Sequence, residues 1–213
     1  MTKTTANLRF RLPGQWYRID PNADDEALVH ARIDEIVRDA VGVADDAAVI
    51  RRRMRDGLRD AATAARAASA EVLLLCREVA PGVPTPISLS VHAPITITPS
   101  IGTSAEQVMR AFELSLPHTS EPDLDSAQRI ELADALVLRQ HVITPQQIEE
   151  GGESIVQNRL DARYWYTVPD AKQVTLVHMT SPLGEIPHAM LRFFDAIVAA
   201  SSWAVAEAGV ERR

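Results

Sequence analysis

The N-terminal third of the chain changes from a strand-like pattern to two helical ones. Apolar and polar side chains alternate over 8–12 and again over 16–19, with Pro13-Gly14 between the two runs. This predicts a short hairpin or one bent edge strand. From Asp24 the apolar positions recur every three or four residues, which predicts a helix that ends at Gly42 and a second helix over about 45–69. Their expected buried positions are Leu28, Ile33, Ile36, Val37 and Val41 in the first helix, and Ile50, Met54, Gly57, Leu58, Ala61, Ala65 and Ala68 in the second.

The middle of the chain returns to alternation. Segments 71–79 and 87–95 are separated by a proline-rich stretch, and they predict a β-hairpin. The second arm has Leu89 and Val91 on one face and Ser90 and His92 on the other, so the sheet is expected to have an apolar and a polar side here.

Shorter elements are expected next. Residues 104–114 have helical spacing, and Glu106 after Thr103 or Ser104 resembles a capping signal. Residues 130–144 are typical of two short strands or one bent strand. The polar stretches 117–127 and 145–158 are predicted to be mobile loops.

The C-terminal block indicates the fold class most clearly. An aromatic strand around Trp165, a turn at Pro169-Asp170 and a second strand precede an amphipathic helix over 186–203, and 205–213 is predicted to be a frayed tail. We therefore predict a single α+β domain over 1–213. It has a mostly antiparallel sheet flanked by helices, with two N-terminal helices and a C-terminal helix packed on it.

Composition narrows the function classes. Of the 213 residues 46% are hydrophobic and 24% are charged, which is typical of a globular domain. The net charge of −7 argues against a nucleic-acid partner, although Arg51, Arg52 and Arg53 form a local basic run that also fits a solvated helix face. No apolar run has the length of about 20 residues needed for membrane insertion, and the N-terminus does not resemble a secretory signal, so a cytoplasmic protein is expected. The single cysteine, Cys76, lies in an apolar run and is expected to be a core thiol rather than a nucleophile.

The candidate chemistry is confined to the polar side of the predicted sheet. No standard catalytic, phosphate-binding or metal-binding motif occurs, so we predict no catalytic residue, no metal ligand and no cofactor. If the strands pair as the pattern indicates, several polar and aromatic side chains share one face of the sheet, and His178 lies one strand away. The three histidines of this region, His92, His141 and His178, would then be able to bind a metal or transfer protons. The alternative is that this face of the sheet carries no such site and is either exposed to solvent or covered by the helices. The candidate binding residues are His92, Arg139, His141, Arg163 and Trp165.

The aromatic triplet Tyr164-Trp165-Tyr166 has two interpretations. It either packs in the core and shields the sheet, or it presents Trp165, beside Arg163, as an anchor for a protein partner.

The pattern over most of the chain resembles uncharacterised actinobacterial proteins related to the PsbP-like superfamily. The likeness is carried by Pro13-Gly-Gln-Trp16, by the aromatic strand with its Val-Pro-Asp turn, and by Leu191-Arg-Phe-Phe-Asp-Ala-Ile197 in the last helix. It implies a small α/β sandwich that serves in binding or assembly, and it brings no catalytic motif. Our first hypothesis is therefore a non-enzymatic accessory module that holds a protein partner or its own copy. The alternative is a small-molecule-binding domain or small enzyme that uses the polar face around His92, His141 and Trp165.

Overall fold

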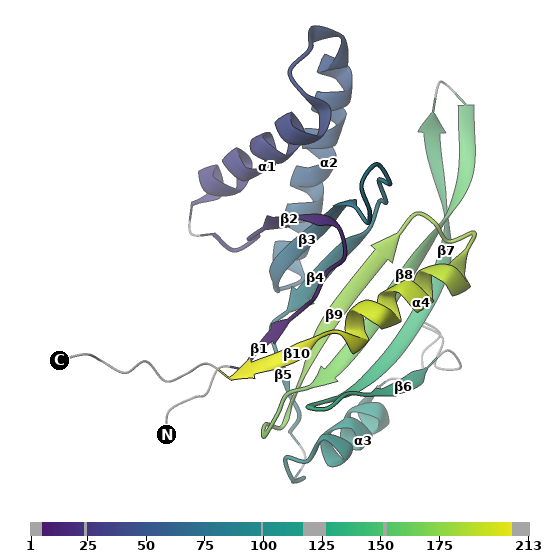
Figure 1. The fold of residues 1–213 in the computed structure, drawn as a ribbon. Helices are drawn as coiled ribbons and strands as arrows, with labels where there is room; N and C mark the ends of the chain where they lie inside the picture. Colours follow the sequence, from purple (N-terminus) through teal and green to yellow (C-terminus); the bar gives the residue numbers. More distant parts are fainter. Residues whose placement is uncertain (1–5, 24, 99, 117–126, 151–152, 206–213) are drawn as a thin grey trace, which may run out of the picture.

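The computed structural model describes residues 6–23, 25–98, 100–116, 127–150 and 153–205. These form an eight-stranded antiparallel sheet with helices on both faces (Figure 1). The predicted α+β class is confirmed. From one edge to the other the strands are β2 (Gln15–Ile19), β3 (Ala70–Glu78), β4 (Ser88–His92), β9 (Gln173–Ser181), β8 (Glu153–Thr167), β7 (Leu136–Glu150) and β6 (Gln128–Glu131), and the short β5 (Ile95–Thr96) also pairs with β9.

The two ends of the described chain pair with each other. Strand β1 (Ala6–Arg9) lies antiparallel to β10 (Ser202–Val205), and we call this pair the terminal ribbon. Of the two predicted alternatives for 8–12 and 16–19 the hairpin is wrong, because β2 pairs with β3 and forms an edge strand of the sheet. The predicted C-terminal helix ends earlier than expected, since α4 covers Pro187–Ala199 and Trp203 belongs to β10.

One side of the sheet, which we call face A, is covered by α4 and the terminal ribbon. Helix α4 lies along the sheet in Figure 1 and buries Phe194 and Ile197 against Tyr164 and Tyr166 of β8. Both tyrosine rings are fully buried, so this part of the aromatic triplet packs in the core as one of the two interpretations expected.

The other side, face B, carries the remaining helices at its two ends. At the β2–β3 end lie α1 (Glu26–Val41) and α2 (Ala48–Ala67), joined by a short 3-10 turn (Asp45–Ala47). Asp25 caps α1 by accepting a hydrogen bond from the Ala27 amide, and Gly42 ends it with a positive φ of 77°, as predicted. Ile33, Ile36 and Val37 are buried as predicted, but at the start of the helix Leu28 is 61% exposed and Val29 is buried in its place.

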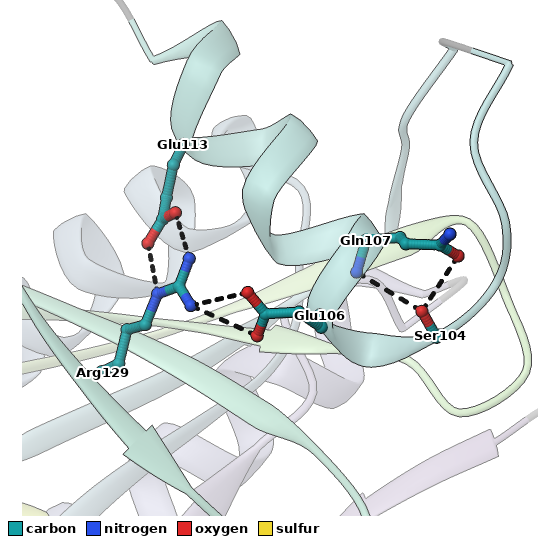
Figure 2. Close-up of polar contacts among 5 residues, drawn as sticks. All are labelled: Ser104, Glu106, Gln107, Glu113 and Arg129. Carbon is teal, nitrogen blue, oxygen red and sulfur yellow. Dashed lines mark hydrogen bonds and ion pairs between the residues drawn. The ribbon is translucent and has the colours of Figure 1, made fainter.

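Helix α3 (Ala105–Ser115) covers the opposite end of face B. Figure 2 shows Arg129 of β6 reaching two carboxylates of this helix, Glu106 at 2.9 Å and Glu113 at 2.5 Å. The helix begins at Ser104, whose hydroxyl accepts a hydrogen bond from the amide of Gln107. The capping signal is therefore completed by Gln107, and Glu106 serves to attach the helix to the sheet.

The polar stretch 145–158 does not form the predicted loop. Strands β7 and β8 continue through it as one long hairpin, with pairs from Val137↔Tyr166 out to Glu150↔Glu153. Cross-strand backbone pairing does not require apolar side chains, so polar composition alone was a poor guide here. Of the other predicted loop, residues 117–126 lie outside the described residues, as do 206–213 of the predicted tail. No helix in the described part of the chain is long and apolar enough to cross a membrane.

Candidate functional site: an open strip on face B

The centre of face B, between the α1–α2 pair and α3, is a strip of polar side chains from β4, β9 and β8. Directly opposed residues point to the same side of a sheet, so register defines its rows. One row runs from Ser90 through His178 to Arg163, and the next from Ser88 through Thr180 to Asp161. We call these six residues, with the adjoining His92 and Arg159, the open strip.

The structure divides the predicted site residues between the two faces. His92, Arg163 and Trp165 lie on face B, as expected. Arg139 is opposite the buried Tyr164 and His141 is opposite the buried Ala162, so both belong to face A. The prediction that these five residues share one face is wrong, because the β7–β8 register places the odd-numbered positions of β7 on the other side.

A three-histidine metal site is also excluded by this division, since His141 lies on the far side of the sheet from His92 and His178. Among the described residues no group of three or more His, Cys, Asp and Glu side chains is arranged to hold a metal ion.

Trp165 lies at the edge of the strip beneath α3. Its ring packs on Phe112, with 4.8 Å between the ring centroids, and its indole N–H donates to Oε1 of Gln140 at 3.2 Å. These contacts stabilise α3 on the sheet. They support the core-packing interpretation of the aromatic triplet more than the partner-anchor interpretation.

Ser90 and His92 form a hydrogen-bonded pair on β4. The Ser90 hydroxyl is 2.9 Å from Nε2 of His92, and Nδ1 of the same ring is 2.8 Å from the carbonyl oxygen of Ala68. A carbonyl only accepts, so Nδ1 carries the proton and Nε2 accepts from Ser90. Burial lowers the pKa of His92, the Ala68 carbonyl opposes this, and the neighbouring His178 lowers it further. The ring is therefore neutral near pH 7.

Asp161 is the one buried carboxylate of the open strip. Arg159 donates to it at 2.7 Å, and Nε2 of His178 lies 3.3 Å from its other oxygen. Burial alone would raise the pKa of Asp161, but the His178 ring and the Arg159 guanidinium outweigh this and hold the pKa below its usual range. Asp161 is therefore ionised and already neutralised by its neighbours.

Arg163 differs from the other charged members of the strip. It is half-buried, on the same face as Asp161, and it has no hydrogen bond or ion pair with any residue that the structure describes. Its guanidinium is available to a planar anionic group.

A groove joins the open strip at the row of Ser88 and Thr180, whose hydroxyls are 2.7 Å apart. It has a volume of about 540 Å³ and lies between the α1–α2 pair and the sheet. Its lining is mainly apolar, with Ile36, Met54, Leu58, Leu75, Pro84 and Pro86.

Two polar residues, Tyr17 and Arg77, also line the groove. The Tyr17 hydroxyl and the Arg77 guanidinium both donate to Asp39, each at 2.6 Å. Burial and the bond to Asp39 raise the pKa of Tyr17 to about 12, so Tyr17 remains a donor at neutral pH. On face B an apolar groove thus adjoins the open strip, where Arg163 is a cation without a partner among the described residues.

No family model and no curated protein matches this chain. Two solved structures are similar to it. A crystal structure from Bacteroides thetaiotaomicron VPI-5482 is 12% identical over 66% of this chain and 40% of its own, with a TM-score of 0.31, so the chain spans less than half the length of that protein. LpqN, involved in cell envelope biogenesis of Mycobacterium tuberculosis, is 9% identical over 95% of this chain and 86% of its own, with a TM-score of 0.37. Both TM-scores are low, and no function is carried to this chain from either protein.

Sequence reasoning missed Arg159 and Asp161 of the open strip. The signal was present, since Arg159, Asp161 and Arg163 are spaced two apart and therefore share a face of one strand. It was hidden because the predicted loop ended at 158 and the following strand was predicted around Trp165, so Arg159 and Asp161 were assigned to neither element.

Proposed function

We propose that the protein is a non-enzymatic binding module that holds an acidic, extended segment of a protein partner on the open strip. The observation that carries this proposal is Arg163, a half-buried residue whose guanidinium has no partner among the described residues, on a strip whose buried carboxylate is already neutralised. A guanidinium that is unpaired and accessible presents five donors to a planar anionic group, so an anion supplied from outside is favoured at this position.

The neighbouring groups indicate a segment rather than a free anion. Ser90 donates to His92, and Ser88 and Thr180 bond each other, which leaves one hydroxyl proton of the Ser88–Thr180 pair to donate to a ligand at the row where the apolar groove begins. A peptide with an acidic side chain near Arg163 and an apolar side chain several residues away matches this order of surfaces. The PsbP-like likeness and a cytoplasmic location belong to the same proposal, and cell fractionation of the native protein tests the location.

Affinity capture with three versions of the chain tests the proposal. Wild-type protein, Arg163→Glu and the control Arg192→Glu, which reverses an exposed charge on α4, are used as baits in native lysate. We expect a stoichiometric protein that wild type and R192E recover and that R163E loses. Recovery of no stoichiometric protein, or equal recovery by R163E, would overturn the proposal.

A second candidate function rests on the Ser90–His92 pair. A serine hydroxyl bonded to a neutral imidazole whose other nitrogen is fixed by a carbonyl is the arrangement that activates a nucleophile. In an acyl transfer Oγ would bond to the acyl carbon, the proton would pass to Nε2, and His92 would return it to the leaving group as that bond breaks. Water would then hydrolyse the ester.

Labelling with a fluorophosphonate separates this candidate from simple binding. A nucleophilic Ser90 gives labelling that Ser90→Ala abolishes and Ser88→Ala retains, because Ser88 bonds Thr180 rather than a histidine. Failure of wild type to react removes the enzymatic candidate and leaves the binding proposal untouched.

A further inference from the structure

A second cavity lies on the opposite side of the sheet from the open strip. It has a volume of about 420 Å³ and lies, partly open, between the terminal ribbon and face A. The ribbon contributes Leu8 and Trp203, which are cross-strand partners, and the sheet contributes Val72, Val91 and Thr175. The volume falls within the range of about 300–1,000 Å³ that is usual for small-molecule sites.

Two buried polar atoms of this cavity have no hydrogen-bond partner among the described residues. They are Oγ1 of Thr175, a residue that is only 3% exposed, and the indole Nε1 of Trp203. A buried polar group without a partner costs on the order of 1–3 kcal/mol, and such groups are rare in folded proteins. Both of these atoms belong to residues that line the same cavity, so a single ligand bound there is able to account for both.

The other two tryptophans show that this is specific to Trp203. The indole N–H of Trp16 donates to the carbonyl of Pro13 at 2.7 Å, and that of Trp165 donates to Gln140. The ribbon that presents Trp203 is fixed, since the backbone N–H of the same residue donates to Asp134 at 2.7 Å. The backbone of Trp203 is therefore held in place beside the cavity.

We propose that this cavity binds a small, mainly apolar molecule that carries one acceptor group, a carboxylate or carbonyl. An indole N–H only donates, so the ligand must supply an acceptor oxygen, and the Thr175 hydroxyl is able to donate to the same group. The apolar body would lie against Leu8, Phe10, Leu12, Val72, Leu74 and Val91. Arg9, Arg18 and Glu71 also line the cavity, and the two guanidiniums outnumber the one carboxylate, which favours a carboxylate ligand over a carbonyl.

The test uses octanoate as a carboxylate and 2-octanone as a carbonyl of similar length. In ¹⁵N-labelled wild-type protein, we expect one or both to shift the Trp203 indole N–H signal in a saturable way. The indole signals of Trp16 and Trp165 should stay in place, because their protons are already bonded. The two ligands distinguish the carboxylate from the carbonyl.

An isosteric variant tests whether the Thr175 hydroxyl contributes to ligand binding. Thr175→Val keeps the shape of the side chain and removes its hydroxyl, and it should weaken binding at least fivefold. Thr63→Val makes the same change at an exposed position of α2, outside both sites, and should leave affinity unchanged. No movement of the Trp203 signal up to millimolar ligand, or equal affinity in T175V, would overturn the proposal. Because the open strip lies on the other face, neither result bears on the proposed partner binding.

Discussion

The guanidinium of Arg139 forms an ion pair with Asp195, which joins β7 to α4 across face A. The hydroxyl of Tyr164 donates to the other carboxylate oxygen at 2.9 Å, and burial together with Asp195 raises the pKa of that tyrosine. Arg139, predicted from the sequence as a binding residue, thus contributes to the packing of the last helix.

Replacing Arg139 by alanine should destabilise the protein. The arginine side chain is only 12% exposed, and its loss leaves Asp195 without its counter-charge. We expect the free energy of unfolding to fall by about 2–3 kcal/mol, less than for fully buried pairs because Asp195 keeps some contact with water. Urea unfolding measures this. Arg192→Ala changes an exposed residue of α4, the helix that carries Asp195, and should alter the free energy of unfolding by less than about 0.5 kcal/mol. An equal effect in both variants would contradict the stabilising role of the Arg139–Asp195 pair.

Arg129 should stabilise the attachment of α3 in a salt-dependent way. Its guanidinium contacts both Glu106 and Glu113 at a partly exposed position (Figure 2). Arg129→Ala is expected to cost about 1 kcal/mol in low salt and less in about 1 M NaCl, where charges are screened. Arg52 lies 4.0 Å from Asp56 with its side chain 83% exposed, so Arg52→Ala serves as the control and should have no measurable effect at either salt concentration.

His92 should make the protein less stable in mild acid. Its pKa is 6.5 in the unfolded chain, and burial together with His178 lowers it in the folded state despite the opposing Ala68 carbonyl. Between the two values the unfolded chain binds more protons, so stability rises with pH. The stabilisation that comes from the neutral His92 ring is fully present above pH 6.5, the pKa of the unfolded chain, and is lost as the pH falls through the lower pKa of the folded state. Urea unfolding between about pH 5 and pH 8 should therefore show a shallower pH dependence in His92→Gln than in wild type, and identical slopes would refute this.

Replacing two glycines, Gly14 and Gly57, by alanine should change the stability of the protein in opposite directions. Gly14 has a φ of +74°, and an added Cβ would lie 1.9 Å from the backbone oxygen of Glu78, so Gly14→Ala should lower the melting temperature. Gly57 lies in α2 with nothing within 4 Å of an added Cβ. Gly57→Ala should therefore raise stability by about 0.5–1 kcal/mol. A gain at both positions in thermal unfolding would show that the turn at Gly14 is not the constraint described here.

Most of the local structure was predictable from the sequence. The helices α1, α2 and α3, the β3–β4 hairpin and the β8–β9 turn at Pro169-Asp170 follow from periodicity and from capping or turn residues, which act over a few positions. The alternation along β4 also assigned Ser88, Ser90 and His92 correctly to one face. These features depend only on neighbours along the chain.

The candidate site was less predictable, because it depends on register between strands. A shift of one residue moves every side chain of a strand to the other face, and nothing local to β7 determines whether Arg139 or Gln140 lies opposite Arg163. The sequence by itself determined the α+β class, the helices and the alternation within each strand. The tertiary structure alone decided that His141 leaves the polar face, that Asp161 and Arg159 join it, and that the two ends of the described chain pair over Thr175. The physical reason is that cross-strand partners are selected by packing between residues far apart in the sequence, and that packing exists only in the folded chain.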